Sequence, residues 1–421
     1  MKSLKTLLNI FAMIVVSLFS VQATMAATYR VPSQRNSIVA AIAAATYNDT
    51  ILVAPGTYTG TGYHDIVFGG MNMVLMSEDG PETTILDGSD NYRILLADMS
   101  EYRSSTVKGF TFRNGQRMES WGLTGMVKIT GSASISFENM IFEGGNSTNG
   151  SAMHVKDGGW ADFTDCVFRD NTSTNKGAIY FEQGHGQFDN CLFEHNTAVE
   201  GAALFLGQGS ATINNCTFQN NTGGTIFAYW NSSTTINDSV FRNITGTTGV
   251  IARTQNISST TMNNCLVTNC TATANYEGAM VCNDSGAFDL LNCTFANNTC
   301  ADPSNGQVDD RHDGSTITNC IIWGAKVGMG TSRCETVTCS LIFGNEGGDA
   351  NPCVDLNTNG NINSDPGFCD PDGLDWRIAS NSPCLPAYSG PCGLIGATEN
   401  GGCTLVATEG LNFGSLKAMY R

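Results

Sequence analysis

Two short stretches of the chain carry side chains that could bind a sugar or transfer a proton. They are His154-Val155-Lys156 and Tyr180-Phe181-Glu182, and each follows a small residue and an alanine. A His or Tyr side chain could act as a base, and a Lys could neutralise an acidic substrate group. Exposed Tyr and Trp rings also offer flat faces to a sugar. His154 and Tyr180 are therefore the candidate catalytic residues, although no complete catalytic constellation surrounds them.

The spacing of the surrounding sequence predicts a longer face with these residues on it. If successive strands stack in register, Leu204, Leu206 and Trp230 continue the two columns as an apolar strip. The predicted binding face contains His154, Lys156, Tyr180, Glu182, Leu204, Leu206 and Trp230. The alternative is an ordinary solvated sheet face that carries a cross-strand ion pair.

Other groups of reactive residues are less convincing. Gly184-His185-Gly186 and Asp309-Asp310 contain residue types used in hydrolysis. At one coil of about 4.8 Å per repeat they lie roughly 24 Å apart, too far to act on one bond. Nor do acidic residues stack on neighbouring coils as a calcium-dependent lyase site would require.

Asp355, Asn357 and Asn359, followed by Gly360, match the first half of an EF-hand-like calcium loop. The bidentate acid expected at the twelfth position is missing, because Pro366 stands there. The pattern favours a turn over a metal site. We expect no cofactor, and Ca²⁺ is the one ion that the sequence leaves open.

The elements that position these side chains form a repeat of about 26 residues. A Cys-x-Phe pair recurs once per repeat, as in Cys191-Leu192-Phe193 and Cys216-Thr217-Phe218. Residues two apart share one face of a strand, so the pair predicts two inward stacks. The inward cysteines, expected to be mostly free thiols, are Cys166, Cys191, Cys216, Cys265, Cys293 and Cys320.

A polar residue precedes nearly every one of these cysteines. Asn tolerates unusual dihedrals at a bend and can bond the backbone of the next coil, so we predict an internal Asn ladder. Its members are Asn139, Asp165, Asn190, Asn215, Asp238, Asn264, Asn292 and Asn319.

Strands that cannot bury a face alone must stack into a solenoid. The predicted fold is all-β: a single-stranded right-handed parallel β-helix of roughly eleven coils, with an N-terminal helical cap and a disulfide-bearing C-terminal tail. An Ala-rich segment at 37–45 predicts the cap. The predicted boundaries are a signal peptide at 1–27, the β-helix at 28–345, a Cys-rich region at 346–403 and a tail at 404–421.

The Ala-rich helix that leads to Asp49-Thr50-Ile51-Leu52-Val53-Ala54-Pro55-Gly56-Thr57-Tyr58 resembles the entry of bacterial right-handed parallel β-helix proteins of the pectin-lyase-like superfamily. The Phe-x-x-Asn turn before Gly-Ala resembles the repeat of polymorphic outer-membrane proteins. The segments Ser364–Cys369, Ser382–Cys384 and Gly393–Ala397 are similar to the end of exported choice-of-anchor Q proteins. Such proteins include lyases, hydrolases and adhesins, so the resemblance implies fold and export but no single activity.

Seven cysteines lie in the Gly- and Asn-rich tail, where disulfides would stabilise a segment without a large core. Local pairing predicts Cys334–Cys339, Cys353–Cys369 and Cys384–Cys392, and leaves Cys403 unassigned. The connectivity cannot be deduced from sequence alone.

The N-terminus and the charge limit the compartment and the partners. Lys2 and Lys5, an apolar stretch and small residues near position 26 predict a secretory signal, hence a secreted or cell-surface protein of bacterial type. A net charge of −17 disfavours nucleic acid, and no other segment is long enough to span a membrane. We expect a face that binds a polysaccharide or another cell-surface component without catalysis. A polysaccharide lyase or glycoside hydrolase that uses the same face is the first alternative, and a structural surface element is the second; the sequence does not predict the oligomeric state.

Overall fold

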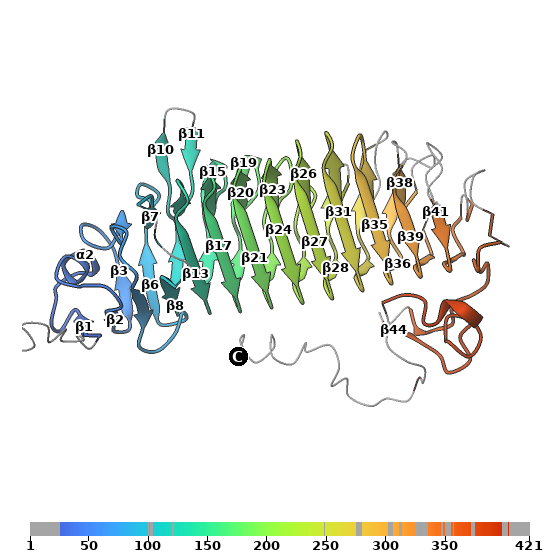
Figure 1. Cartoon of the computed structure of the whole chain (residues 1–421), viewed down its shortest axis with the longest axis horizontal. Coiled ribbons are helices and arrows are strands. Elements are labelled where there is room, and N and C mark those ends of the chain that lie inside the picture. The colour runs from blue at the N-terminus through green and yellow to red at the C-terminus, as the bar shows by residue number, and fades with distance from the viewer. Residues whose placement is uncertain are drawn as a thin grey trace, which may run out of the picture.

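The computed structural model describes residues 26–403 except 100, 102–103, 120–121, 248, 275–279, 302–305, 311–313, 326–327, 329–335, 347, 350–354, 357, 372–374 and 398–402. The predicted signal peptide and the final tail lie almost wholly outside these residues. Across the described part, the chain winds into a parallel β-solenoid of about 11 turns (Figure 1). The predicted fold class is confirmed.

Three parallel sheets run the length of the solenoid. The thirteen-stranded sheet contains β1 (Thr28–Val31), β2 (Thr50–Val53), β5 (Val74–Ser77), β8 (Thr106–Lys108), β13 (Ser134–Glu138), β17 (Trp160–Thr164), β21 (His185–Asp189), β24 (Ser210–Asn214), β27 (Ser233–Asn237), β31 (Ser259–Asn263), β35 (Ala287–Leu291), β39 (Thr316–Thr318) and β41 (Thr336–Thr338). The twelve-stranded sheet contains β3 (Gly56–Tyr58), β6 (Thr84–Asp87), β9 (Thr111–Arg113), β14 (Ile141–Glu143), β18 (Val167–Arg169), β22 (Leu192–Glu194), β25 (Thr217–Gln219), β28 (Val240–Arg242), β32 (Leu266–Thr268), β36 (Thr294–Ala296), β40 (Ile321–Trp323) and β42 (Leu341–Phe343).

The ten-stranded sheet carries the predicted binding face. Its strands are β4 (Ile66–Val67), β7 (Leu95–Ala97), β12 (Val127–Ile129), β16 (Met153–Lys156), β20 (Ile179–Glu182), β23 (Leu204–Gly207), β26 (Ile226–Tyr229), β30 (Ala252–Gln255), β34 (Val281–Asn283) and β38 (Val308–Asp310). A smaller four-stranded sheet, β10 (Arg117–Glu119), β11 (Gly122–Thr124), β15 (Asn146–Asn149) and β19 (Thr172–Lys176), adjoins it, and the β10–β11 hairpin projects beyond the coils (Figure 1). Beyond it lies a three-stranded sheet of β29 (Thr245–Gly246), β33 (Thr271–Ala272) and β37 (Thr299–Cys300).

Phenylalanine rings stack along the inside of the twelve-stranded sheet. The centroid of the Phe193 ring lies 4.6 Å from that of Phe168 and 4.8 Å from that of Phe218, with near-parallel planes. All three side chains are fully buried. The predicted inward column is therefore confirmed, and the coil spacing of a parallel sheet explains its regular step.

The cysteine column is also confirmed. Cys166, Cys191, Cys216 and their equivalents Cys265, Cys293 and Cys320 are buried free thiols. Their sulfur atoms hydrogen-bond to backbone carbonyl oxygens, as from Cys191 to Phe163 at 3.7 Å. A thiol here replaces a small apolar side chain at no cost in unsatisfied polar groups.

The prediction of an internal ladder from the residues before cysteine is wrong. Asn190 and Asn215 have φ of 58° and 52°, and their side chains, joined at 2.6 Å, lie on the exposed side of the corner. The internal ladder is made instead by Asn171, Asn196 and Asn221, which are buried. The left-handed backbone turns the first set outward, so a bend residue need not be an inward one.

In the internal ladder, each amide bonds the coils on both sides. Asn196 Nδ2 donates to the Phe168 carbonyl at 2.8 Å and to Asn221 Oδ1 at 3.2 Å, and Asn196 Oδ1 accepts from the Asn171 backbone N–H. This saturates polar groups that the turn would otherwise bury unpaired. The signal was present in the sequence as Phe-x-x-Asn.

The predicted N-terminal cap is a single short helix, α2 (Ile38–Ile42), placed beside β1 and β2. The Ser37 hydroxyl accepts a hydrogen bond from the Ala40 N–H at 3.2 Å and caps the helix. Ile38, Ala41 and Ile42 are buried and cover the first coil. Among the described residues, no helix has the length and apolar character needed to cross a membrane.

The C-terminal segment folds back on the last coils and carries an antiparallel pair, β43 (Phe368–Asp370) and β44 (Asp375–Ile378) (Figure 1). Its disulfides are Cys339–Cys392 and Cys369–Cys403, each with Cα atoms 5.3 Å apart. Disulfides in this region are confirmed, but the predicted pairs of Cys339, Cys369 and Cys392 are wrong, and Cys384 is a buried free thiol. Cys334 and Cys353 lie outside the described residues.

The physical reason for the different pairing is tertiary packing. Ile378 and Ile395 of the tail bury against Ile321 and Leu341 on the outside of the last coils. This contact brings Cys392 to Cys339 across 53 residues of sequence. Pairing by sequence proximity cannot anticipate a segment that docks on a distant surface.

Candidate functional site

An outward column of side chains runs along the ten-stranded sheet. The register aligns Lys128, His154, Tyr180, Phe205, Phe227 and Arg253 on successive strands. A second column aligns Lys156, Glu182, Gly207, Tyr229 and Gln255. The structure therefore brings His154, Lys156, Tyr180 and Glu182 together.

The placement of Leu204 and Leu206 on this face is wrong, because both are buried in the core. Tyr180 pairs with Phe205, 25 residues on, whereas the glycines used to align the two strands, Gly177 and Gly201, are only 24 apart. Side chains alternate along a strand, so a slip of one residue exchanges the two faces.

Trp230 is exposed but does not continue the second column, which runs through Tyr229 instead. Trp230 stands at the corner after β26 with φ of 57° and is 56% exposed. Its ring meets the Tyr229 ring edge-to-face with centroids 6.0 Å apart. The pair forms an accessible aromatic ledge beside the sheet.

Three outward aromatic rings form a continuous cluster next to this ledge. Tyr180, Phe205 and Phe227 pack edge-to-face, with centroids 5.5 Å and 5.1 Å apart, and Tyr229 packs against them. Aromatic rings on the solvent side of a sheet are an unusual expense of apolar surface. We call Tyr180, Phe205, Phe227, Tyr229 and Trp230 the aromatic ridge.

His154 and Glu182 form a contact at one end of the ridge. His154 Nε2 lies 3.0 Å from Glu182 Oε2, and the His154 ring stacks on Tyr180 at 4.8 Å. Lys156 Nζ lies 3.8 Å from the same carboxylate oxygen. The His154 side chain is only 2% exposed, whereas that of Glu182 is 43% exposed.

The environment of these groups argues against a base at either candidate position. Burial raises the pKa of Tyr180 well above its usual value, so the phenol stays protonated at neutral pH. His154 is covered and its Nε2 is engaged. The hydrogen bond from His154 lowers the pKa of Glu182, assisted by the lysines, so Glu182 is an ionised and weak base.

Two pockets open beside the ridge. The first, of about 210 Å³, is lined by His154, Lys156, Lys176, Tyr180, Glu182 and residues of the adjoining sheet. Lys176 Nζ lies 4.6 Å from the centroids of both the Tyr180 and the Phe205 rings. In the described part of the chain, no carboxylate lies within ion-pair distance of this ammonium.

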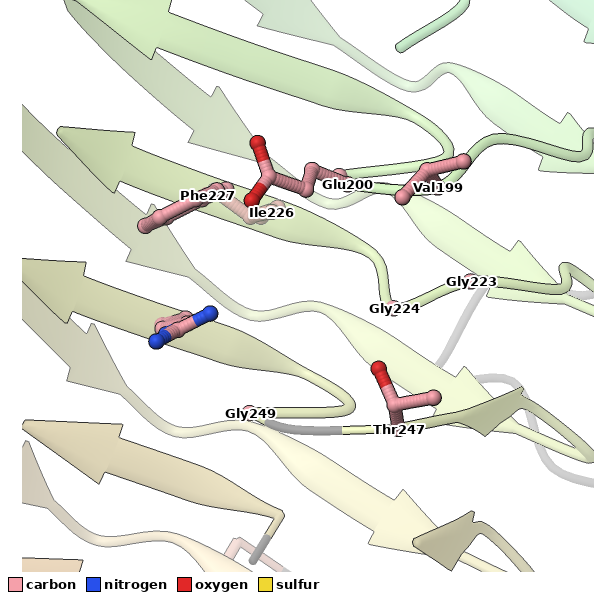
Figure 2. Close-up of a pocket in the computed structure, with 10 residues that line it drawn as sticks. Val199, Glu200, Gly223, Gly224, Ile226, Phe227, Thr247 and Gly249 are labelled. Atoms are coloured by element: carbon pink, nitrogen blue, oxygen red, sulfur yellow. The ribbon is translucent and has the colours of Figure 1, made fainter. Parts of the chain in front are cut away.

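The second pocket, of about 100 Å³, lies two coils further on (Figure 2). Glu200 and Val199 stand on one side of it, Gly223 and Gly224 at its back, and Thr247 and Gly249 on the other side. Phe227 of the ridge and Arg253 also line it. Arg253 donates two hydrogen bonds to Asp284 Oδ2, at 2.9 Å and 2.8 Å.

The remaining candidates are not brought together. His185 lies on β21 of the thirteen-stranded sheet, and Asp309 lies buried on β38 of the ten-stranded sheet. In the possible calcium loop, the Asp355 carbonyl accepts from Thr358 and Asn361, and Asn359 has the left-handed φ of a turn; Asn357 lies outside the described residues. Within those residues, no group of three or more His, Cys, Asp or Glu could hold a metal ion.

The comparisons with known proteins agree on the fold. Residues 97–259 match the family described as "Right handed beta helix region". No curated protein sequence matches the chain.

Solved structures that resemble the chain are all of low identity. Pectate lyase Pel9A is 14% identical over 89% of this chain and 96% of that one, with a TM-score of 0.43. The catalytic domain of GH87 alpha-1,3-glucanase in complex with nigerose is 10% identical over 74% of this chain, with a TM-score of 0.36, and the chain spans only 65% of its length. The AlgE6 A-module, a mannuronan C-5 epimerase of Azotobacter vinelandii, is 15% identical over 74% of this chain and 72% of that one, with a TM-score of 0.20. At such identities the likeness concerns the fold alone.

Sequence reasoning missed most of the ridge. Phe205, Phe227 and Tyr229 were not among the predicted residues, nor were Lys176, Glu200 and Arg253. Counting from the inward Cys-x-Phe pair, instead of from the glycine before each strand, would still have failed, because the connections differ in length from coil to coil.

Proposed function

We propose that this protein binds a glycan along the outer face of the ten-stranded sheet without chemically altering it. The observation that carries the proposal is the aromatic ridge, an outward row of rings over three successive strands with a pocket on each side. A sugar ring stacked on Tyr229 or Trp230 would contribute about 1 kcal/mol per contact. Several such contacts along a polymer add through effective concentration.

The polar groups beside the ridge suit a hydroxyl-rich ligand. Lys156, Glu182 and Lys176 present donors and acceptors around the first pocket. A concave site with aromatic walls and a few placed polar groups is the common form of a carbohydrate site. The polymer would lie along the solenoid axis, across strands rather than along one of them.

A glycan on an exported protein also accords with the predicted secretory signal and the disulfides. Disulfides persist in oxidising compartments, and Cys339–Cys392 and Cys369–Cys403 fasten the C-terminal segment. We therefore place the protein outside the cell or on its surface. Its partner there would be a polysaccharide or another cell-surface component.

The enzymatic alternative has one observation in its favour, namely the half-exposed Glu182 beside Lys156 in the first pocket. A polysaccharide lyase or glycoside hydrolase would have to use Glu182, with His154 as a positioning residue behind it. In that case Glu182→Gln would abolish product formation. Reducing-sugar and unsaturated-product assays on any bound glycan decide between the two functions.

The test of binding is a glycan array followed by titration calorimetry on the ligands found. Tyr229→Ala and Trp230→Ala together should weaken binding at least tenfold, since each stacking contact contributes about 1 kcal/mol. Tyr388→Ala is the matched control, because Tyr388 is 60% exposed and lies in the C-terminal segment. Unchanged affinity in the double variant would refute the proposal and favour a structural surface element.

A further inference from the structure

The second pocket exists because one connection of the solenoid is shorter than its neighbours. The corner residues Thr172, Thr197, Thr222 and Thr245 are in register on successive coils. From each of them the chain reaches the first residue of the next ten-stranded-sheet strand, Ile179, Leu204, Ile226 or Ala252, which are also in register. The steps are 7, 7, 4 and 7 residues, so the coil with Gly223 and Gly224 lacks three residues at this corner.

The missing residues leave a notch one coil deep. The connections above and below, which carry Glu200 and Thr247, are two coil spacings apart, about 10 Å from backbone to backbone. The back wall is glycine of necessity: a Cβ on Gly223 would lie 1.6 Å from the Ala198 carbonyl oxygen. Figure 2 shows the gap, with Glu200 and Phe227 on one side and Thr247 on the other.

The charges at the notch are arranged unusually. Lys176 is the cross-coil neighbour of Glu200 and would be its natural ion-pair partner. Its ammonium instead lies over the Tyr180 and Phe205 rings, at the first pocket. Among the described residues, no hydrogen bond or ion pair engages the Glu200 carboxylate.

The other charged groups at the notch neutralise each other, since Asp284 holds Arg253 at 2.8 Å. The notch therefore keeps one uncompensated negative charge, that of Glu200, next to the Phe227 ring. Carboxylates and aromatic faces both attract an ammonium group. A neutral acetamido group of the same sugar would gain neither attraction.

We propose that the notch is a subsite for a protonated amino group of the bound glycan, with Glu200 as its counter-ion. The inference rests on the proposed function and names its ligand class, a polymer that contains free amino sugars. The ridge supplies stacking for any sugar, while the notch selects the amine.

The experiment compares a glucosamine oligomer with the N-acetylated oligomer of the same length, by calorimetry on the full mature chain. The unaltered protein should bind the amine about fivefold more tightly, as expected for one partly exposed ion pair. Glu200→Gln should abolish this preference and leave the affinity for the acetylated oligomer unchanged. Glu138→Gln, a carboxylate on the thirteen-stranded sheet, is the control and should keep it.

A second variant tests the notch without touching Glu200. Replacing residues 223–225 by the sequence of 246–251 restores a seven-residue step and fills the gap. It should also remove the preference for the amine, and circular dichroism and the melting temperature report whether it folds.

The outcomes separate the two proposals. A preference that persists in Glu200→Gln, or none in the unaltered protein, overturns the notch while Trp230-dependent binding of both oligomers upholds the ridge. If Trp230→Ala changes neither affinity, or if no oligomer binds, both fail.

Discussion

Phe193 is held between two parallel rings, and its removal would leave a cavity that the neighbours cannot fill. The rings of Phe168 and Phe218 are fixed by their own strands at one coil spacing on each side. Phe193→Ala should therefore lower the free energy of unfolding by about 3–5 kcal/mol, as other buried Phe truncations do. Chemical denaturation measures it.

Val199→Ala is the control for that measurement, because Val199 is 63% exposed. Its effect should stay within about 0.5 kcal/mol. A Phe193 variant as stable as the control would mean that the stack can close over the missing ring.

Glu182 makes a pH-dependent contribution to stability. Its pKa is lowered in the folded protein, chiefly by the hydrogen bond from His154. A depressed carboxyl pKa stabilises the fold above the unfolded value of about 4.5, and this contribution disappears as the pH falls through the lower, folded value. The side chain is 43% exposed, so solvent screening reduces the effect to a few tenths of a kcal/mol at most.

Glu182→Gln should accordingly lower the melting temperature slightly at neutral pH and leave it unchanged at about pH 3, where both side chains are neutral. Melting curves across this range are the measurement. An equal loss at both pH values would point to packing, not charge.

At this scale, sequence alone predicted four of the site residues in their correct columns and misplaced three. His154, Lys156, Tyr180 and Glu182 belong to two coils exactly one regular repeat apart. Beyond them the step changes, and Leu204 and Leu206 fall on the inner face. Periodicity predicts which residues alternate, but a single inserted residue in a connection decides which set faces solvent.

At the scale of elements, the C-terminal segment behaves as a clasp on the last coils. Its apolar side chains Ile378 and Ile395 pack on the solenoid, and Cys339–Cys392 ties the two together. Replacing both cysteines by serine should destabilise the docking of the segment by about 2–4 kcal/mol, because the chain-entropy restraint is lost.

The expected readout is limited proteolysis, with early cleavage between Phe368 and Ile395 and a protected solenoid. Tyr388→Ala, in the same segment but exposed, should be cleaved no faster than the parent chain. Simultaneous digestion of the coils would show that the clasp also holds the solenoid.

The strands and the inward stacks could be predicted because each coil repeats the same burial problem. The corners could not, since their conformation depends on the coil above. Asn190 and Asn196 illustrate this: six residues apart on one coil, the first turns outward with a left-handed backbone and the second bonds three coils. Nothing in their residue type separates them.

The whole molecule shelters ten described cysteines as free thiols. Burial raises the pKa of Cys270 and of Cys384 to about 12, and it raises that of Cys166 as well. Because the thiolate is the reactive form, these groups should resist alkylation in the native protein.

Iodoacetamide at about pH 8 should leave all ten unlabelled in the folded protein and label them after denaturation in guanidinium, where thiols regain a pKa near 8.5. Peptide mass spectrometry identifies the sites. Native labelling of Cys191 or Cys216 would contradict an inward column.

The short connection at Gly223 and Gly224 has a consequence for how such a molecule can change over generations. Along the outward column, successive steps from His154 to Tyr180, Phe205, Phe227 and Arg253 are 26, 25, 22 and 26 residues, yet the strand ladders stay unbroken. Deletions and insertions at this corner are therefore paid for locally and are not transmitted to the interior. A lineage could open, close or move a pocket by editing a few codons, with the stacked core inherited intact beneath it.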